Sequence, residues 1–359
     1  MKIGIFGGTF NPPHVGHLEA AVGVADELGL ERVYVVPARV PPHKDLPAGS
    51  PSAEVRYGLT ELLFAGDSRF VVTDVELLRT GPSHSLDTVL EIGKWHPGAE
   101  LHLLVGADMA ETLGTWHRAA ELLELVTPVP FERTAVSSTL VREALPRRLG
   151  MEYLTEPVYS AIIAGGYYGA RPGFDWLRTG AEALLGPQRV LHMRGTEAAA
   201  VSLAEHWGAD VELAREAAIL HDITKGLNRE AQLQIYEEYD IIPDDFESGS
   251  EKLLHAMSGA LVARARFGVC DAVFEAIACH TTGRGGMTLL DKVLYLADYI
   301  EPNRDFPEVE HMRELAYTDI DAALLYGMEL TGESLRARGI SPHPRTQAAL
   351  DGFKMRVAD

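Results

Sequence analysis

The chain has 359 residues, and its 52 acidic against 32 basic side chains give a formal net charge of −20. This length predicts two or three domains, and the charge disfavours nonspecific binding to nucleic acid or an anionic membrane, which needs clustered Lys and Arg. Only two cysteines occur, Cys270 and Cys279, and no leader or bilayer-spanning run is visible. We therefore expect a cytoplasmic protein without a disulfide scaffold and without a nucleic-acid or membrane partner.

The first half of the sequence alternates two patterns. Short apolar runs typical of strands lie at 2–6, 32–36, 70–75 and 101–105, and segments with a helical period lie at 15–28, 53–65 and 85–94. Strands that alternate with helices favour parallel pairing and right-handed crossovers. The pattern predicts an α/β domain with a doubly wound, Rossmann-like parallel sheet over residues 1–170, whose ligands bind at the carboxyl ends of the strands.

The strand pattern stops after about residue 174. Helical patterns then dominate, for example at 197–207, 211–220, 255–267, 272–279 and 289–300. The stretch GGYYGARPG at 165–173 is rich in Gly and typical of a boundary. We expect a second, all-α domain over residues 175–359.

The stretch GGTFNPPHVGH at 7–17 lies between the first predicted strand and the first predicted helix. Gly7 and Gly8 lack a Cβ and let the backbone approach a ligand. The N-terminus of the helix offers N–H groups and a positive dipole end, which together make an anion site. His14 and His17 lie on one face of its first turn and can donate to phosphate oxygens. The stretch predicts a phosphate-binding site.

This stretch resembles the H-x-G-H signature of the nucleotidyltransferase superfamily, and further motifs follow in order. They are VPARVPPHK at 36–44, SHSLDT at 83–88, GADMAETLGTW at 106–116, SSTLVR at 137–142 and EPVYSAI at 156–162. Together they resemble the bacterial nicotinate-nucleotide adenylyltransferase family, which makes deamido-NAD and pyrophosphate from nicotinate mononucleotide and ATP.

The resemblance implies roles for particular residues. His14, His17 and Lys44 would be catalytic, and Mg²⁺ would accompany ATP. Since the nucleophile is an existing phosphate, catalysis would consist of positioning and charge stabilisation. The implied substrate-binding residues are Gly7, Gly8, Thr9, Phe10, Ser85, Asp108, Trp116, Ser137, Ser138, Thr139 and Arg142.

One interval departs from the family pattern. Between Trp116 and SSTLVR the family usually has another strand and an Arg-Pro-Gly loop, and here only 20 residues intervene. A missing edge strand and a missing part of the adenine-side wall would fit this shortened interval, which leaves weakened or lost activity open beside adenylyl transfer. Two alternatives stay open for this half: another H-x-G-H transferase, such as a pantetheine-phosphate adenylyltransferase, and a regulatory module that binds nucleotide without turnover.

Histidines and aspartates form a second set in the helical half. Ala217–Leu220 make the turn before His221 and Asp222 apolar, so this pair is expected inside the domain, where it needs a partner or a metal. Imidazole and carboxylate without thiolate suit Fe, Mn, Co or Zn. The candidate ligands are His192, His221, Asp222, His255, His280 and Asp298.

This H…HD…D set is the signature of the HD phosphohydrolase superfamily. HDITKG, HTTGR, LDKVLYLADYIEPNR and SPHPRTQ resemble the HD family that hydrolyses diadenosine tetraphosphate symmetrically to two ADP. The resemblance implies a di-iron centre, with His255 and His280 as the added ligands of a binuclear site and Asp222 also catalytic. The residues that would hold the polyphosphate are Arg189, Lys225, Thr281, Arg304, His343 and Arg345.

Some alternatives remain for this half. Each basic residue could instead form a surface salt bridge, and the substrate could be a deoxynucleoside triphosphate or a guanosine alarmone. Taken together, the sequence predicts a bifunctional nucleotide enzyme. Its expected partners are ATP, nicotinate mononucleotide and diadenosine tetraphosphate or ADP, and a homo-oligomer is compatible with the sequence.

Overall fold

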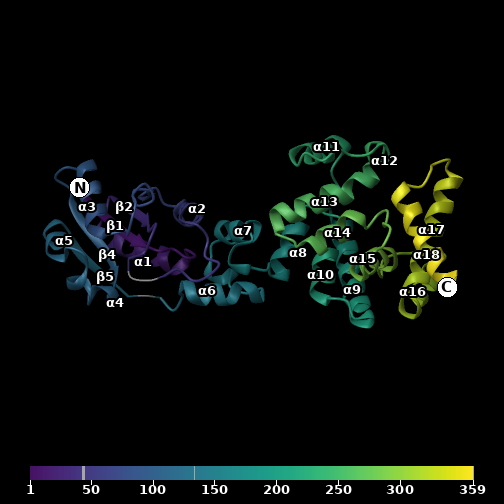
Figure 1. Cartoon of the computed structure of the whole chain (residues 1–359), viewed down its shortest axis with the longest axis horizontal. Coiled ribbons are helices and arrows are strands. Elements are labelled where there is room, and N and C mark those ends of the chain that lie inside the picture. The colour runs from purple at the N-terminus through teal and green to yellow at the C-terminus, as the bar shows by residue number, and fades with distance from the viewer. Residues whose placement is uncertain (43–44, 133, 359) are drawn as a thin grey trace. The chain divides into compact units, whose positions relative to one another are not determined.

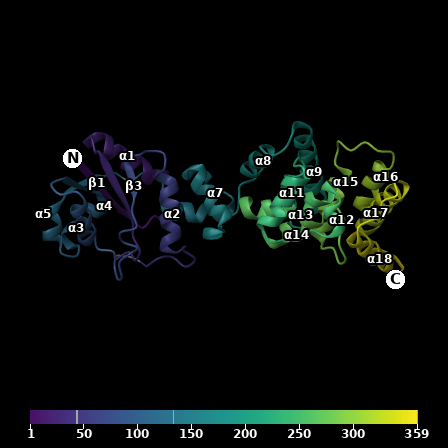
Figure 2. The ribbon, with the colours of Figure 1, turned by 90° about the horizontal axis from the view of Figure 1, so that it is seen from above.

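The computed structural model describes residues 1–42, 45–132 and 134–358 (Figure 1). The chain divides into two compact units, Met1–Gly173 and Phe174–Asp359. The first unit contains all the strands of the described residues and the second is helical, as Figure 2 shows from above. The predicted architecture, a doubly wound parallel α/β sheet followed by an all-α domain, is confirmed.

The first unit is built on a parallel sheet with strand order β3-β2-β1-β4-β5. Its strands are β1 (Lys2–Gly8), β2 (Arg32–Pro37), β3 (Phe70–Val72), β4 (Glu100–Gly106) and β5 (Thr127–Phe131). Its helices are α1 (Val15–Leu28), α2 (Ala53–Phe64), α3 (Ser85–Trp95), α4 (Ala107–Ala110), α5 (Ala119–Leu125), α6 (Ser138–Ala144) and α7 (Glu156–Ala164). Short 3₁₀ turns lie at Leu113–Thr115, Leu145–Arg147, Met151–Tyr153 and Tyr167–Gly169.

Both faces of the sheet are covered, because alternate strand residues point to opposite sides. Ile5 and Val105 belong to a buried cluster that includes Leu86 and Ile92 of α3. Phe6, the next residue of β1, points to the opposite face and packs edge-on against Phe64 of α2, with ring centroids 6.5 Å apart. The near-continuous apolar strands of the sequence reflect this burial on two sides.

The edge strand that would be missing in a shortened interval is present. Residues 127–131 (TPVPF) form β5 and pair in parallel with β4, with Leu103 opposite Pro128 and Val105 opposite Pro130. The two prolines have low strand propensity, so the sequence pattern did not predict a strand here. At a sheet edge they are tolerated, because the N–H groups on the outer side of an edge strand have no ladder partner to lose.

The second unit consists of helices around one apolar core. Its helices are α8 (Phe174–Glu182), α9 (Pro187–Trp207), α10 (Val211–Leu220), α11 (Arg229–Glu238), α12 (Asp245–Ser248), α13 (Glu251–Phe267), α14 (Asp271–Cys279), α15 (Leu289–Ile300), α16 (Val309–Thr318), α17 (Ile320–Ala337) and α18 (Pro344–Ala358). In the described part of the chain, no helix combines the length and the hydropathy needed to cross a membrane.

Helix α15 lies at the centre of this unit. Its sequence LLDKVLYLADYI is apolar on most sides, and Val293, Leu294, Leu296 and Ala297 have no exposed surface. A capping box at Thr288 starts the helix, since the Thr288 hydroxyl accepts from the Asp291 N–H and the Asp291 carboxylate accepts from the Thr288 N–H. Near its end, the buried helix carries Asp298 to the candidate site.

Candidate functional site

The first candidate site lies at the carboxyl edge of the sheet. The strand order reverses direction between β1 and β4, and ligands of open α/β sheets bind at such a switch point. The 7–17 segment leaves β1 at this point, and Asp108 lies in α4, directly after β4. The fold therefore places the first predicted motif and Asp108 at the same edge.

The two glycines of the motif have different surroundings. A Cβ on Gly7 would meet nothing within 4 Å, so this backbone is open to approach. A Cβ on Gly8 would lie 2.8 Å from the ring of Phe10. Phe10 is buried with φ of 49° and packs edge-on against Phe6 at a centroid distance of 5.6 Å. Gly8 serves the packing of Phe10, while Gly7 leaves space for a ligand.

The two histidines stack at the start of α1. Their ring centroids lie 3.7 Å apart, and the N–H of His14 donates to Nδ1 of His17 at 3.2 Å. Because Nδ1 of His17 accepts this bond, the proton of the neutral ring lies on Nε2. Gly16 makes the arrangement possible, since a Cβ there would lie 2.2 Å from Oγ1 of Thr134 and 3.2 Å from the ring of His14.

A second helix N-terminus meets this segment. Ser137 caps α6 by accepting from the Leu140 N–H at 3.2 Å. Ser138 donates its hydroxyl to the carbonyl of Pro12 at 2.9 Å, and Arg142 donates to the carbonyl of Asn11 at 2.5 Å. The predicted SSTLVR motif therefore lies against the 7–17 segment.

The remaining predicted residues of this unit are distributed as follows. Thr139 accepts a hydrogen bond from Arg142 at 3.0 Å, and the carbonyl of Thr9 faces α2. Ser85 and Trp116 line one small hollow together with His84 and His117, whose rings stack at 4.2 Å. Lys44 lies outside the residues that the structure describes.

Arg56 is a residue that sequence reasoning missed. It is fully buried on α2 and donates to the carbonyls of Thr9, at 2.6 Å, and Arg39, at 3.2 Å. Burial lowers the pKa of its guanidinium, and within the described residues no carboxylate forms an ion pair with it. Its signal in the sequence was a cation three residues before Leu59 and seven before Leu63, on the apolar face of an expected helix.

The second candidate site is a cluster of imidazoles and carboxylates drawn from five helices. His192 comes from α9, and His221 and His280 directly follow α10 and α14. His255 belongs to α13 and Asp298 to α15. His221, Asp222, His255 and His280 are buried. All six predicted metal ligands converge, His255 through a contact of 3.1 Å with Asp222.

Asp222 lies between two groups of ligands. Its Oδ2 atom is 3.6 Å from Nε2 of His221 and 3.7 Å from Nε2 of His192, which is also 3.0 Å from Oδ1 of Asp298. Its Oδ1 atom is 3.1 Å from Nε2 of His255 and 3.6 Å from Nε2 of His280. One carboxylate thus offers one oxygen to each group, an arrangement suited to two adjacent cations.

The electrostatics of the cluster favour metal binding. Burial lowers the pKa of His221 and of His255 to about 4, so both imidazoles are neutral at pH 7 and offer a lone pair. Burial opposes the charged form of Asp298, but the hydrogen bond from His192 together with the nearby His221 and Lys225 outweighs it and holds the pKa of Asp298 well below its ordinary value. Neutral imidazoles and ionised carboxylates form a donor set that fits divalent metal ions.

Three of the predicted phosphate-binding residues lie at the rim of the cluster. Lys225 and Arg189 contact Oδ2 of Asp222 at 3.0 and 3.3 Å, and Arg304 donates to Oδ1 of Asp298 at 2.7 Å. Thr281, half-buried, directly follows His280. These cations reach the carboxylates from the partly exposed side of the site.

His343 and Arg345 make different contacts. His343 pairs with Asp244 of the turn before α12 at 2.9 Å, and Arg345 with Glu247 of α12 at 3.3 Å. These contacts join α12 to the start of α18 instead of reaching Asp222. A role of both residues in holding phosphate stays a prediction.

Comparison with known protein families divides the chain in the same way. Residues 5–159 match the cytidylyltransferase-like family, and residues 189–303 match the HD domain. The two matches cover the two candidate sites separately. The presence of an HD domain implies a divalent metal in the second.

Individual relatives also match one half each. A "Probable nicotinate-nucleotide adenylyltransferase" of Geobacillus kaustophilus is 42% identical over 200 residues, which are 50% of this chain and 92% of the relative. A "Bis(5'-nucleosyl)-tetraphosphatase, symmetrical" of Bacillus subtilis is 43% identical over 144 residues, 40% of this chain and 77% of the relative. The solved structure of a "predicted HD superfamily hydrolase involved in NAD metabolism" from Clostridium acetobutylicum is 33% identical, with a TM-score of 0.51, and covers 52% of this chain and 100% of its own.

Proposed function

Since the chain belongs to the nicotinate-nucleotide adenylyltransferase family through one half and to the symmetrical bis(5'-nucleosyl)-tetraphosphatase family through the other, we propose that it is a bifunctional nucleotide enzyme. The first unit transfers an adenylyl group from ATP to nicotinate mononucleotide, which yields deamido-NAD and pyrophosphate. The second unit hydrolyses diadenosine tetraphosphate to two molecules of ADP.

The geometry of the first site supports adenylyl transfer. A phosphate oxygen of nicotinate mononucleotide attacks the α-phosphorus of ATP, and the bond to pyrophosphate breaks, so no protein nucleophile is needed. The starts of α1 and α6 meet through the contact between Ser138 and Pro12, and both offer N–H groups to anionic oxygens. His14 and His17 add donors for charge that develops on the leaving group. ATP enters with Mg²⁺ as its counterion.

The geometry of the second site supports metal-dependent hydrolysis. His192, His221, Asp298 and Oδ2 of Asp222 would hold one cation, and His255, His280 and Oδ1 of Asp222 the other. The bound pair supplies an acidified water and neutralises phosphate charge. Iron is the metal we propose, with Mn, Co and Zn as the alternatives that suit the same donors. Lys225, Arg189 and Arg304 hold the remaining phosphates.

The division of the Asp222 carboxylate between two histidine groups is the observation that carries the hydrolase proposal. The test incubates the metal-loaded protein with diadenosine tetraphosphate, and separately with nicotinate mononucleotide plus ATP, and identifies the products by mass. We expect ADP alone from the first reaction, and deamido-NAD with pyrophosphate from the second. ATP with AMP, or preferential cleavage of a deoxynucleoside triphosphate or guanosine alarmone, would contradict the hydrolase assignment.

The presence of β5 supports turnover in the first unit over nucleotide binding alone. The expectation of a weakened site depended on a missing edge strand and on a missing part of the adenine-side wall. The strand is present and pairs with β4 over five residues, and the state of the wall stays a prediction. A protein that is stabilised by nucleotide but forms no deamido-NAD would instead favour the regulatory module.

A further inference from the structure

The four histidines of the cluster differ in the group that contacts Nδ1, the ring nitrogen that faces away from the candidate metal positions. Nδ1 of His221 lies 2.8 Å from the carbonyl of Ala218, and Nδ1 of His280 lies 2.7 Å from the carbonyl of Ile277. Each is a neutral acceptor one turn back in the chain. Nδ1 of His192 instead lies 3.1 Å from a carboxylate oxygen of Glu301. Nδ1 of His255 is buried and has no hydrogen-bond partner in the described parts of the chain.

Glu301 is held firmly in this position. It is 2% exposed, and its Oε2 atom accepts from the N–H of Asn303 at 2.7 Å and from the side-chain amide of Asn303 at 2.9 Å. Helix α9 makes room for it, because a Cβ on Gly195 would lie 2.2 Å from Oε2. A buried carboxylate that is bonded on one oxygen and aimed at an imidazole with the other is fixed for that contact.

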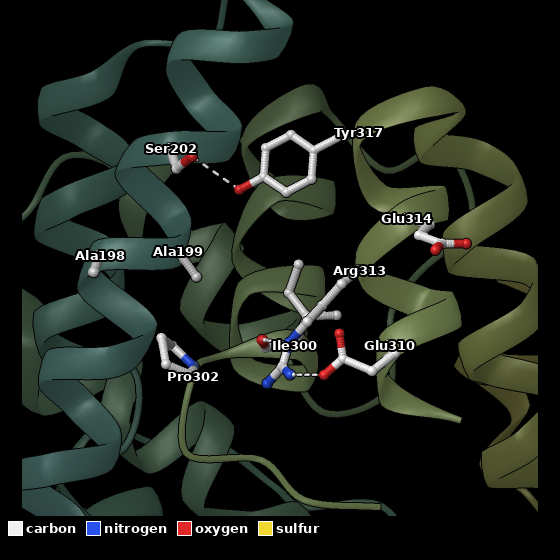
Figure 3. A pocket seen from close by; sticks show the side chains of 9 residues that line it. All are labelled: Ala198, Ala199, Ser202, Ile300, Pro302, Glu310, Arg313, Glu314 and Tyr317. Atoms are coloured by element: carbon white, nitrogen blue, oxygen red, sulfur yellow. Dashed lines mark hydrogen bonds and ion pairs between the residues drawn. The ribbon is translucent and has the colours of Figure 1, made fainter. Parts of the chain in front are cut away.

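A side chain of a neighbouring helix stabilises the turn that carries Glu301. Arg313 of α16 donates to the carbonyls of Ile300, Glu301 and Arg304 at 3.0, 2.9 and 3.2 Å. Figure 3 shows Arg313 in a surface hollow between α9 and α16, with Ile300 and Pro302 on either side of Glu301 in the sequence lining the same hollow. The position of the Glu301 carboxylate is thus set by three elements: α9, α16 and the turn itself.

We propose that Glu301 is a positioning residue that makes the two metal positions unequal, with the tighter one formed by His192, His221 and Asp298. A carboxylate on the far nitrogen of a ligating imidazole fixes the proton on that nitrogen, directs the other nitrogen to the metal and makes it a stronger donor. At the other position, Nδ1 of His280 faces a neutral carbonyl, and Nδ1 of His255 has no hydrogen-bond partner among the described residues. This inference rests on the proposed binuclear hydrolase.

The test titrates the metal-free full-length protein with Mn²⁺ and measures free Mn²⁺ by electron paramagnetic resonance. For the unaltered chain we expect two binding steps of different affinity. Glu301→Gln should weaken the tighter step about 10- to 100-fold and leave the weaker step in place. Gln keeps the size of the side chain but cannot offer an acceptor to both Asn303 and His192.

A second variant approaches the same contact from the opposite helix. Gly195→Ala places a methyl group where Oε2 lies and should weaken the same step, without altering Glu301 itself. Glu333→Gln, an exposed glutamate on α17, is the matched control and should leave both steps unchanged. Circular dichroism confirms that each variant is folded. A variant that unfolds is replaced in the test by the other.

The outcomes separate the inference from the proposed function. Two steps of equal affinity in the unaltered chain would overturn the inference, and so would equal weakening of both steps in Glu301→Gln and Gly195→Ala. In either case, two bound metals and ADP formation would still support the proposed hydrolase activity. Binding of no metal, or a lack of ADP from diadenosine tetraphosphate with metal bound, would overturn the proposed function itself. A selective loss of the tighter step in both variants supports the inference.

Discussion

Asp222 is the residue on which the second site depends most, because its two oxygens contact different histidine groups. Replacing it by Asn removes the negative charge at almost constant volume. We expect Asp222→Asn to lower metal affinity at both positions and to reduce tetraphosphate hydrolysis by more than the roughly 10- to 100-fold that loss of an outer-shell partner costs, with adenylyl transfer unchanged. Metal content and both reaction rates, measured on one preparation, check this.

The control for this change is Asp351→Asn, at an exposed aspartate on α18. It should leave metal content and both rates unaltered. Hydrolysis that continues in Asp222→Asn with an undiminished metal content would refute the assignment of Asp222.

The buried histidines also predict how the metal-free protein responds to pH. The pKa of His221 and His255 is about 4 in the folded chain and about 6.5 when unfolded. Between about pH 6.5 and 4.5 the unfolded chain therefore binds protons that the folded chain does not. Stability falls as the pH falls, by up to about 1.4 kcal/mol per pH unit for each histidine.

His192 does not reverse this trend. Its pKa is raised, since the hydrogen bonds that it donates to Asp298 and Glu301, with the charge of Asp298, outweigh burial. A raised pKa stabilises the folded chain, and this contribution levels off once the pH is well below the unfolded value of about 6.5. The melting temperature of the metal-free protein, recorded from pH 7 to 4.5, checks the prediction. A His255→Gln variant should show a shallower dependence, and an unchanged melting temperature over the window would count against buried, neutral histidines.

At the scale of elements, the first turn of α1 depends on the absence of a Cβ atom at Gly16. A Cβ on Gly16 would lie 2.2 Å from Thr134 and crowd the ring of His14. Because a displacement of about 1 Å in a catalytic group can cost 10²-fold in rate, we expect Gly16→Ala to slow adenylyl transfer by about 10- to 100-fold. The hydrolase activity of the same preparation should not change.

The same helix provides a matched control. Gly23 is exposed, and a Cβ there would meet nothing within 4 Å. Gly23→Ala should raise stability by about 0.5–1 kcal/mol through helix propensity and leave the transfer rate as it is. Equal rates for both variants would show that the space beside Gly16 is not required.

The elements also show where sequence patterns mislead. Helix α1 begins and ends where the pattern predicted, at Val15 and Leu28, because a histidine cap precedes it and Gly29, with φ of 62°, ends it. Strand β5 was missed because Pro128 and Pro130 oppose strand propensity everywhere except at an edge. Which strand lies at the edge depends on the order of the sheet, and a segment of five residues does not encode that order.

At the scale of the whole molecule, the two units carry separate cores and separate ligand sites. We expect two calorimetric transitions on heating. Mn²⁺ should shift one of them, and nicotinate mononucleotide with a non-hydrolysable ATP analogue the other, since a ligand at 100 times its Kd stabilises the folded unit by about 2.7 kcal/mol. Differential scanning calorimetry with each ligand separately makes the measurement.

A result in which either ligand shifts both transitions equally would contradict independent units. The Asp222→Asn variant provides the internal check, because it should abolish the shift with Mn²⁺ and preserve the shift with the nucleotides.

The sequence by itself determined the class of each half, the succession of motifs and the residues that could bear the chemistry. These are local properties: a glycine pair before a helix, an apolar turn before His221 and Asp222, and an imidazole set without thiolates. They are readable because backbone conformation and donor type depend on neighbours in the chain.

Only the tertiary structure decided which of these residues act together. It divided the Asp222 carboxylate between two histidine groups and brought Ser138 to Pro12 across 126 residues. It also revealed Arg56 beneath the 7–17 segment and Glu301 behind His192, two charged side chains with no distinctive motif of their own. Burial and the approach of a distant helix give such residues their roles, and both arise only when the helices pack.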